Sequence, residues 1–331
     1  MKGAAHPVRV HALMQTGKRA LLIELRPVER RGKLWRRLSA PAALPAVEAG
    51  AHIDLRVGSV VRQYSLINAP GEAHRYLICV QAEPEGRGGS IRIHETLTVG
   101  TELTVSAPRN RFPLVHSEKT LLVAAGIGVT PLLSMAEELS ASGADFELHV
   151  FGSDAAAISL REHIDASAYA SRVTYHTGAR VQRDSAITTL VSAQNREARL
   201  YICGPDAFMT SIIDRALGVG WAADRIHQER FVPAEPSARA NEDAPFTVQL
   251  ARDGRRFAVP AGASIAHVLR DGGVIVDVSC EQGMCGTCLT RVVAGVPDHR
   301  DVVQSEEEKA ANSELTLCCS RSLTPELVID L

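Results

Sequence analysis

The sequence predicts a multidomain protein, in which an antiparallel β-barrel domain precedes an α/β Rossmann-like nucleotide domain and a small cysteine-rich C-terminal domain. Three observations predict this order: short alternating runs up to Phe112, strand–turn–helix units from Thr120 onward, and five of the seven cysteines within Cys280–Cys319. At 331 residues, the chain is long enough for two or three domains that each bury a core. We place the domains at residues 1–114, 115–231 and 245–331, with a linker at 232–244.

The N-terminal third consists of short runs with alternating or apolar character. Examples are His52–Val57, Tyr76–Val80 and Glu102–Ser106, which are separated by glycine and proline turns. Short strands with frequent turns favour an antiparallel sheet. The segment from Val8 to Phe112 is therefore expected to form an antiparallel β-barrel.

The middle of the chain alternates between strand-like and helix-like segments. The apolar run Thr120–Ala125 enters the turn Gly126–Pro131 and then the helix-like Leu132–Leu139. Further strands are expected at Phe146–Phe151, Arg172–Tyr175 and Arg199–Cys203. Such βα units predict a doubly wound parallel sheet. The proline-containing segment that follows lacks apolar periodicity and is expected to be an exposed linker.

The cysteine spacing in the last domain carries the strongest chemical signal. Four residues separate Cys280 from Cys285, two separate Cys285 from Cys288, and twenty-nine lie between Cys288 and Cys318. This is the spacing of a plant-type 2Fe-2S cluster, in which one tight loop supplies three thiolates and a distant segment the fourth. Zinc sites, the alternative, usually arrange four cysteines as two closely spaced pairs.

Two features refine the expected cluster site. Glycines at Gly283 and Gly286 would let the backbone wrap closely, so that amide N–H groups can hydrogen-bond to the sulfurs. Cys319 competes with Cys318 for the fourth position. If both lie on a strand, they point to opposite faces, so only one of them can be a ligand.

Two segments of the barrel suit a flavin. Arg62 can pair with a phosphate, Tyr64 can lie along the ring, and Ser65 can hydrogen-bond its reactive edge. Gly89 and Ser90, in a glycine-rich turn, can offer amides and a hydroxyl to the phosphate. Taken singly, the same residues are better explained as a half-buried strand aromatic and an ordinary glycine turn, so the flavin interpretation depends on their combination.

Two turns of the α/β domain suit a nicotinamide nucleotide. Gly126 and Gly128 stand between a strand and a helix, where small residues allow a pyrophosphate to approach the helix N-terminus, although the six-residue Rossmann fingerprint is absent. The second turn, Cys203–Pro205, ends a strand on the same expected edge of the sheet. Asp154 would suit ribose hydroxyls and repel a 2′-phosphate, which favours NADH, while the nearby Arg161 weakens that preference.

Charge and hydropathy restrict the partners. The formal net charge is −2, and no long run of lysine and arginine occurs, so neither nucleic acid nor an anionic membrane is expected as a partner. Apolar stretches of about 18 residues and a signal-peptide pattern are also missing, so we expect a cytoplasmic protein. Partners should be small molecules or proteins.

Taken in order over essentially the whole chain, these segments resemble the phthalate dioxygenase reductase family, which includes vanillate demethylase reductases. The segments that carry the resemblance are Arg62–Leu66, Gly86–Ser90, Gly126–Pro131, Cys203–Pro205, Glu229–Phe231, Cys280–Cys288 and Pro297–Asp301. The resemblance implies an FMN-binding β-barrel, an NAD-binding α/β domain and a C-terminal β-grasp plant-type ferredoxin domain. It further implies NADH as donor, noncovalent FMN, a 2Fe-2S cluster and a Rieske-type oxygenase as acceptor.

The resemblance also implies roles for particular residues. The FMN contacts would be Arg62, Tyr64, Ser65, Gln81, Gly89, Ser90, Thr130 and, against the ring, Phe231. The nicotinamide nucleotide would lie on Gly126, Gly128, Asp154, Cys203, Gly204 and Pro205. The family ending assigns Cys318 as the fourth cluster ligand, after Cys280, Cys285 and Cys288. Ala125 departs from the family, which usually has glycine there, and could crowd the nucleotide turn.

The expected activity is an electron relay from NADH through a flavin to the 2Fe-2S cluster. Hydride carries two electrons and the cluster accepts one, so a flavin must stand between them. We place Ser65 and Cys203 at the hydride-transfer junction. The alternatives are a reductase for a cytochrome P450 and a zinc-stabilised interaction module without redox activity. Glu306–Glu308 could serve in docking or could simply begin a helix capped by Ser305.

Overall fold

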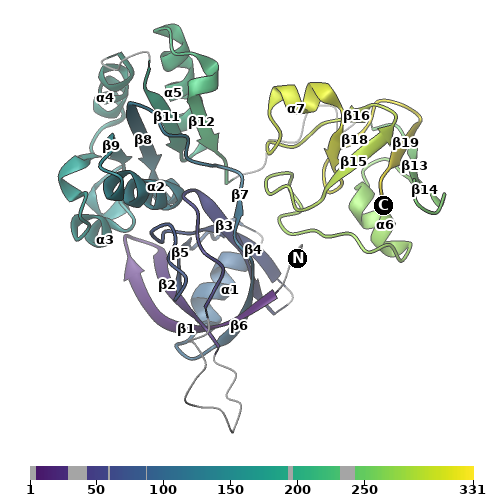
Figure 1. Ribbon diagram of the computed structural model, residues 1–331, viewed down its shortest axis with the longest axis horizontal. Helices are drawn as coiled ribbons and strands as arrows, with labels where there is room; N and C mark the ends of the chain where they lie inside the picture. The colour runs from purple at the N-terminus through teal and green to yellow at the C-terminus, as the bar shows by residue number, and fades with distance from the viewer. Residues whose placement is uncertain (1–4, 29–42, 59, 87, 193–196, 232–242) are drawn as a thin grey trace. The chain divides into compact units, whose positions relative to one another are not determined.

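The computed structural model describes residues 5–28, 43–58, 60–86, 88–192, 197–231 and 243–331. Most of the linker expected at 232–244 therefore lies outside the described residues. The chain divides into two compact units, one spanning residues 3–231 and the other 232–331 with the first two residues. Figure 1 shows the elements of each unit.

The N-terminal part of the first unit is an antiparallel sheet with the order β4-β3-β6-β1-β2-β5, and β7 pairs with β3. β4 and β5, at the two ends of this order, contact each other, so the sheet curls into the expected barrel. Alternating residues such as Val8, Ile23, Ile53 and Ile78 fill its interior. The bounds are β1 Ala5–Thr16, β2 Ala20–Pro27, β3 Ala51–Val57, β4 Val60–Ser65, β5 Tyr76–Gln81, α1 Gly89–Thr96, β6 Glu102–Ser106 and β7 Arg109–Asn110.

The second part of this unit is a parallel sheet with the order β10-β9-β8-β11-β12. Apolar side chains on both faces of the sheet are buried, one face against α2 and α3 and the other against α4 and α5 (Figure 1). The bounds are β8 Lys119–Ala125, α2 Val129–Ala141, β9 Asp145–Phe151, α3 Arg161–Asp165, β10 Val173–His176, α4 Arg180–Ser192, β11 Arg199–Cys203, α5 Asp206–Gly218 and β12 Ile226–Glu229. Short 3-10 turns occur at 126–128, 155–157, 170–172 and 223–225.

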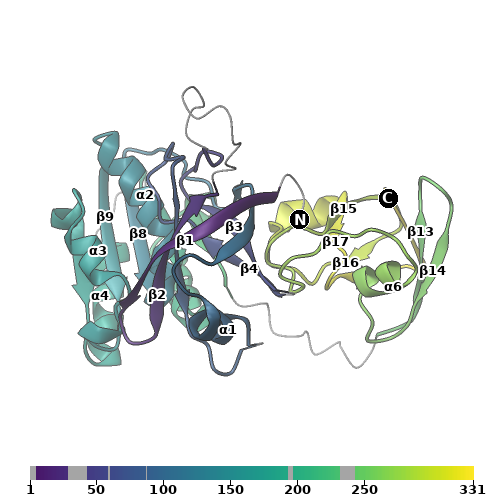
Figure 2. The ribbon, with the colours of Figure 1, turned by 90° about the horizontal axis from the view of Figure 1, so that it is seen from below.

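The C-terminal unit has a sheet of order β14-β13-β19-β15-β17 that packs on α6, and a small β16-β18 ladder. β13 and β19 run parallel, while the other pairs of the sheet are antiparallel. This is the expected β-grasp arrangement, seen from a second direction in Figure 2. The bounds are β13 Phe246–Leu250, β14 Arg256–Val259, α6 Ile265–Asp271, β15 Leu289–Ala294, β16 Pro297–Asp298, α7 Glu306–Ala311, β17 Glu314–Thr316, β18 Arg321–Ser322 and β19 Glu326–Ile329.

Glu306–Glu308 form the start of a helix capped by Ser305, which is one of the two interpretations of this run given above. The Ser305 hydroxyl accepts a hydrogen bond from the Glu308 amide, and the Glu308 carboxylate accepts one from the Ser305 amide. This capping box and the three early acids stabilise the start of α7. Among the helices of the described residues, none has the length and apolar character needed to cross a bilayer.

Candidate cluster, flavin and nucleotide sites

The loop from Cys280 to Cys288 connects α6 to β15 and directs backbone amides at cysteine sulfurs. Positive φ angles at Glu281, Gly283 and Gly286, of 56°, 72° and 66°, turn the loop tightly. The amides of Gln282 and Met284 donate to Cys280 Sγ at 3.3 and 3.4 Å, and that of Thr287 to Cys285 Sγ at 3.3 Å. The Gly283 amide donates to Cys318 Sγ at 3.3 Å, which links the loop to the distant cysteine.

The four predicted ligands meet at this loop. The thiol of Cys280 contacts those of Cys285 and Cys318, and Cys318 also contacts Cys288. The hydrogen bond from Cys285, followed by those from Cys318 and the two loop amides, lowers the pKa of Cys280 well below the usual thiol range. The structure therefore brings together the set that the sequence predicts.

The donor set fits an iron–sulfur cluster chemically. Thiolates are the ligands of 2Fe-2S clusters, and amides aimed at sulfur stabilise the negative charge that the cluster carries. Among the described residues, no group of three or more His, Cys, Asp or Glu side chains is already arranged to hold a metal ion.

Cys319 differs from the expectation in its setting. It and Cys318 lie in a turn directly after β17, not on a strand, so the argument from opposite strand faces is wrong. The Cys319 Sγ atom lies 3.1 Å from Thr316 Oγ1, and a Cβ added to Gly283 would come within 2.5 Å of that sulfur. Cys319 therefore packs against the cluster loop, and Gly283 is required there for space as well as for its positive φ.

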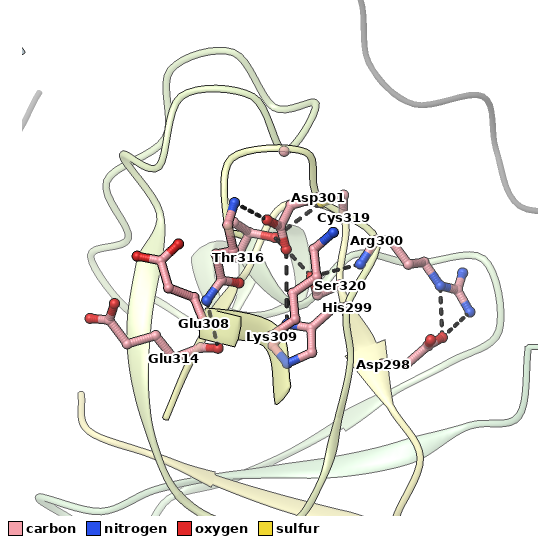
Figure 3. Close-up of polar contacts among 12 residues, drawn as sticks. Asp298, His299, Arg300, Asp301, Glu308, Lys309, Glu314, Thr316, Cys319 and Ser320 are labelled. Atoms are coloured by element: carbon pink, nitrogen blue, oxygen red, sulfur yellow. Dashed lines mark hydrogen bonds and ion pairs between the residues drawn. The ribbon is translucent and has the colours of Figure 1, made fainter. Parts of the chain in front are cut away.

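The buried carboxylate of Asp301 forms hydrogen bonds next to the cysteine loop. Asp301 accepts a hydrogen bond from the Gln304 amide at 2.9 Å and one from Thr316 Oγ1 at 3.5 Å. Figure 3 shows Asp301, Thr316, Cys319 and Ser320 converging, with Thr316 and Ser320 hydroxyls 2.8 Å apart. This network fixes the turn that carries Cys318.

The predicted flavin residues of the barrel lie on two adjoining elements. Arg62, Tyr64 and Ser65 belong to β4, while Gly89 and Ser90 open helix α1. A Cβ on Gly89 would stand 2.8 Å from Arg62 Nε, so the guanidinium lies directly over the start of the helix. An arginine beside a helix N-terminus suits a phosphate. The predicted turn at Gly86–Ser90 is thus partly helical.

The nucleotide turns meet at the carboxyl edge of the parallel sheet. Gly128 lies so close to Cys203 that a Cβ would approach the Cys203 carbonyl oxygen to 2.3 Å. Gly126 has a φ of 57° and faces open space. The methyl group of Ala125 would lie 3.1 Å from a Cβ on Gly204, so it packs between the two turns. The backbones of the two turns are therefore in contact and form one continuous surface at this edge of the sheet.

The remaining predicted residues lie around these turns. Thr130, 2% exposed, donates to the Ile127 carbonyl at 3.0 Å from the first turn of α2, and Gln81 ends β5. Asp154 follows β9, as expected. Phe231 lies two residues beyond β12 and is 37% exposed, so its ring has surface to offer. Its contact with the flavin stays a prediction.

Sequence reasoning assigned no role to Glu229, which the structure places at the junction of barrel and sheet. Ser65 Oγ lies 3.4 Å from Glu229 Oε2, and Glu229 is the register partner of Cys203 across β11 and β12. Burial raises the pKa of Glu229 to about 8, although the hydrogen bond with Ser65 opposes this. Burial, followed by the charge of Glu229, raises the pKa of Cys203, so this thiol stays protonated.

Comparisons with known proteins agree with this arrangement. Residues 248–323 match the 2Fe-2S iron-sulfur cluster binding domain family. Vanillate O-demethylase oxidoreductase of Pseudomonas sp. (strain HR199 / DSM 7063) is 45% identical over 292 residues, which cover 87% of this chain and 91% of that protein. The match to a 2Fe-2S family argues against the alternative of a zinc-stabilised interaction module.

Two solved structures extend the likeness to the whole chain. One is phthalate dioxygenase reductase, described as a modular structure for electron transfer from pyridine nucleotides to [2Fe-2S]. It has a TM-score of 0.71 and 34% identity, covering 99% of this chain and 98% of that one. The other is an intact type IV self-sufficient cytochrome P450 monooxygenase, with a TM-score of 0.85 and 30% identity, covering 99% of this chain and 41% of that one.

Proposed function

The chain belongs to the phthalate dioxygenase reductase family, whose members carry electrons from a pyridine nucleotide through a flavin to a 2Fe-2S cluster for an oxygenase, and we propose that its own acceptor is a Rieske-type oxygenase. The observation that carries the relay is the meeting of Cys280, Cys285, Cys288 and Cys318 at one amide-lined loop, and the full-length match to phthalate dioxygenase reductase supports an oxygenase as the acceptor.

We further propose FMN as the flavin. A flavin accepts a hydride and gives up single electrons, which joins a two-electron donor to a one-electron cluster. Arg62 and the amides that open α1 at Gly89 and Ser90 would bind a terminal phosphate, as expected for a mononucleotide. The Ser90 hydroxyl accepts from the Glu83 amide at 3.0 Å, which leaves its proton free for a phosphate oxygen.

Ser65, Cys203 and Glu229 lie where the barrel meets the parallel sheet. They would orient the nicotinamide and flavin rings, and all three are uncharged at neutral pH. Ser65 is 6% exposed and holds its hydroxyl toward Glu229, so its position is fixed. Cys203 is fully buried and uncharged, and Glu229 keeps its proton near neutral pH because of its raised pKa. A neutral, dry edge favours close approach of nicotinamide and flavin, and hydride transfer needs no acid–base pair.

The donor we propose is NADH, because Asp154 stands where a ribose would bind. We place the reaction in the cytoplasm, where cysteines such as these stay reduced. Anaerobic NADH should bleach the flavin absorption and then the sulfide-to-iron absorption of the purified holoprotein. A colourless holoprotein would contradict both cofactors, and chromatography of the released flavin separates FMN from FAD.

The acceptor is tested by mixing the reduced protein with a purified Rieske oxygenase or a haem P450 domain. We expect the Rieske centre to be reduced at least about tenfold faster, a difference of about 1.4 kcal/mol in activation free energy. The P450 is the second candidate, because the P450 monooxygenase structure contains a region similar to this whole chain. Faster reduction of the haem would favour that candidate and overturn the Rieske proposal.

A further inference from the structure

Lys18 of the barrel forms an ion pair with Asp154 of the nucleotide domain. The Lys18 Nζ atom lies 2.6 Å from Asp154 Oδ2, although the two residues are 136 positions apart in the sequence. Both domains belong to the same compact unit. A cation from the barrel therefore stands at the carboxylate that is expected to bind the ribose.

The turn that carries Lys18 is held against the nucleotide domain by the Thr16 side chain and by close packing at Gly17. The Leu160 amide donates to Thr16 Oγ1 at 2.8 Å, and Leu160 itself has a φ of 61°. Gly17 packs so closely that a Cβ there would be 3.3 Å from Ser159 Cα. Figures 1 and 2 both show this end of β1 and β2 beside α3. Lys18 is thus positioned at Asp154 by the fold.

The carboxylate of Asp154 already accepts hydrogen bonds from three donors. Its Oδ1 atom accepts from the Ala157 amide at 3.0 Å, and its Oδ2 atom accepts from Ser153 Oγ at 3.1 Å as well as from Lys18. The hydrogen bond from Lys18 lowers the pKa of Asp154, so the group is ionised at neutral pH. A ribose hydroxyl that approaches Oδ2 therefore shares this oxygen with the ammonium group.

Arg161, the cation that the sequence suggested, faces elsewhere. Its Nε atom lies 3.5 Å from Asp165, and its guanidinium carbon lies 4.6 Å from the centre of the Tyr175 ring. The cation that bears on the ribose position is therefore Lys18, which no sequence pattern pointed to.

Building on the NADH site proposed above, we propose that Lys18 determines how strongly this protein discriminates NADH from NADPH. Alone, Asp154 would accept both ribose hydroxyls and repel a 2′-phosphate. An ammonium group at Oδ2 offsets that repulsion, offers the phosphate a partner, and competes with the hydroxyls. Each of these three effects makes the difference in affinity between NADH and NADPH smaller.

The test uses oxidised holoprotein with Lys18→Met, which keeps the apolar stem and removes the charge. Dissociation constants for NAD⁺ and NADP⁺ are measured by calorimetry, and flavin reduction by NADH and NADPH by stopped flow. We expect NADP⁺ binding to weaken about fivefold and NAD⁺ binding to stay equal or tighten, the size expected for one charge near the surface. High salt should reduce the difference.

Two further variants separate charge from packing. Arg19→Met removes a neighbouring exposed charge from the same turn, so both dissociation constants should stay within about twofold of the wild type. Asp154→Asn keeps Lys18 and should shift the preference toward NADP⁺. An unchanged NADP⁺ to NAD⁺ ratio in Lys18→Met would overturn the proposal, as would equal weakening of both nucleotides. Failure of the wild type to accept electrons from NADH would instead contradict the proposed function.

Discussion

At the scale of single residues, neighbouring cysteines in the last domain have different settings. The Cys318 sulfur accepts the Gly283 amide and contacts two other predicted ligands, whereas Cys319 contacts Thr316 behind the loop. Of the two, only Cys318 contacts Cys280 and Cys288, while Cys319 contacts the Cys318 thiol itself. Position in the turn after β17, and not alternation along a strand, separates the two.

This difference gives a direct prediction for paired serine variants. Cys318→Ser should lose most of the cluster, while Cys319→Ser should retain about two irons per chain, because a 2Fe-2S cluster needs four thiolates. Iron and sulfide content and the visible spectrum of each purified protein measure this. Equal loss in both variants, or loss only in Cys319→Ser, would show that the ligand assignment is wrong.

The carboxyl group of Glu229 makes stability depend on pH. Its pKa rises from the ordinary 4.5 to about 8 in the folded protein, so the folded state binds more protons than the unfolded state between these values. Its contribution to stability is complete below pH 4.5 and is lost as pH rises through 8. Glu229→Gln should therefore flatten the decline of the free energy of unfolding over this window.

Thermal melting of the holoprotein between pH 5 and 9, followed by flavin fluorescence, measures the effect. The difference in slope should not exceed about 1.4 kcal/mol per pH unit, the limit that one bound proton sets. The exposed Glu95→Gln serves as the control. Parallel curves for Glu229→Gln and the wild type would refute the raised pKa.

Local spacing was enough to predict the three loop cysteines as cluster ligands, but it could not predict roles for Glu229 or Lys18. The loop cysteines are a few positions apart, so their chemistry is visible in the sequence. Glu229 meets Ser65 across 164 positions, and Lys18 meets Asp154 across 136. Such pairs depend on how the barrel packs on the parallel sheet, which no local pattern encodes. The one sign in the sequence was that Glu229 opens Glu229–Phe231, one of the segments that carry the family resemblance.

At the scale of elements, a buried ion pair connects β3 to β7. Arg109 donates to both oxygens of Asp54, at 2.9 and 2.7 Å, and the Asp54 side chain is fully buried. Arg109→Met would remove both of these hydrogen bonds from a buried carboxylate, which typically costs about 3–5 kcal/mol. The double variant Asp54→Leu/Arg109→Met should recover much of this loss, because no buried charge remains at this site.

Flavin release during urea unfolding reports on the barrel and so measures both variants. The exposed Arg111→Met is the matched control and should change the midpoint little. If Arg109→Met unfolds at the wild-type midpoint, the ion pair contributes nothing measurable to the barrel.

Strands and helices were predicted well where a single period dominates. β3, β5, β6, β8 and β11 lie within about a residue of their expected runs, because each alternates or is continuously apolar. The short helix α3, Arg161–Asp165, begins after Leu160, which has a left-handed conformation. The Leu160 amide donates to Thr16 Oγ1 of the barrel, so a tertiary contact and not a local period sets where this helix starts.

At the scale of the whole molecule, the chain separates into two units that each bury their own apolar cores. The boundary at Phe231 coincides with the end we proposed for the nucleotide domain, while the split at residue 114 lies inside the first unit. The barrel and the parallel sheet share one core cluster, in which Ile67 and Phe112 pack with Leu132 and Met135. The flavin and nucleotide parts are therefore expected to fold as one body.

This division predicts what a chain ending at Phe231 can do. Because the barrel, the parallel sheet and their shared core remain intact, residues 1–231 should bind flavin and accept electrons from NADH at a rate within about threefold of the full chain. Transfer to the oxygenase should fall below about 1% of the full-length rate, because the one-electron exit is missing. Stopped-flow reduction by NADH and ferricyanide turnover measure the first property, and oxygenase reduction measures the second.

A full-length Cys318→Ser protein separates loss of the cluster from loss of the domain: it should reduce ferricyanide normally and the oxygenase poorly. If the truncated protein still reduced the oxygenase at the full rate, electrons would leave directly from the flavin, and the cluster would not be the exit of this relay.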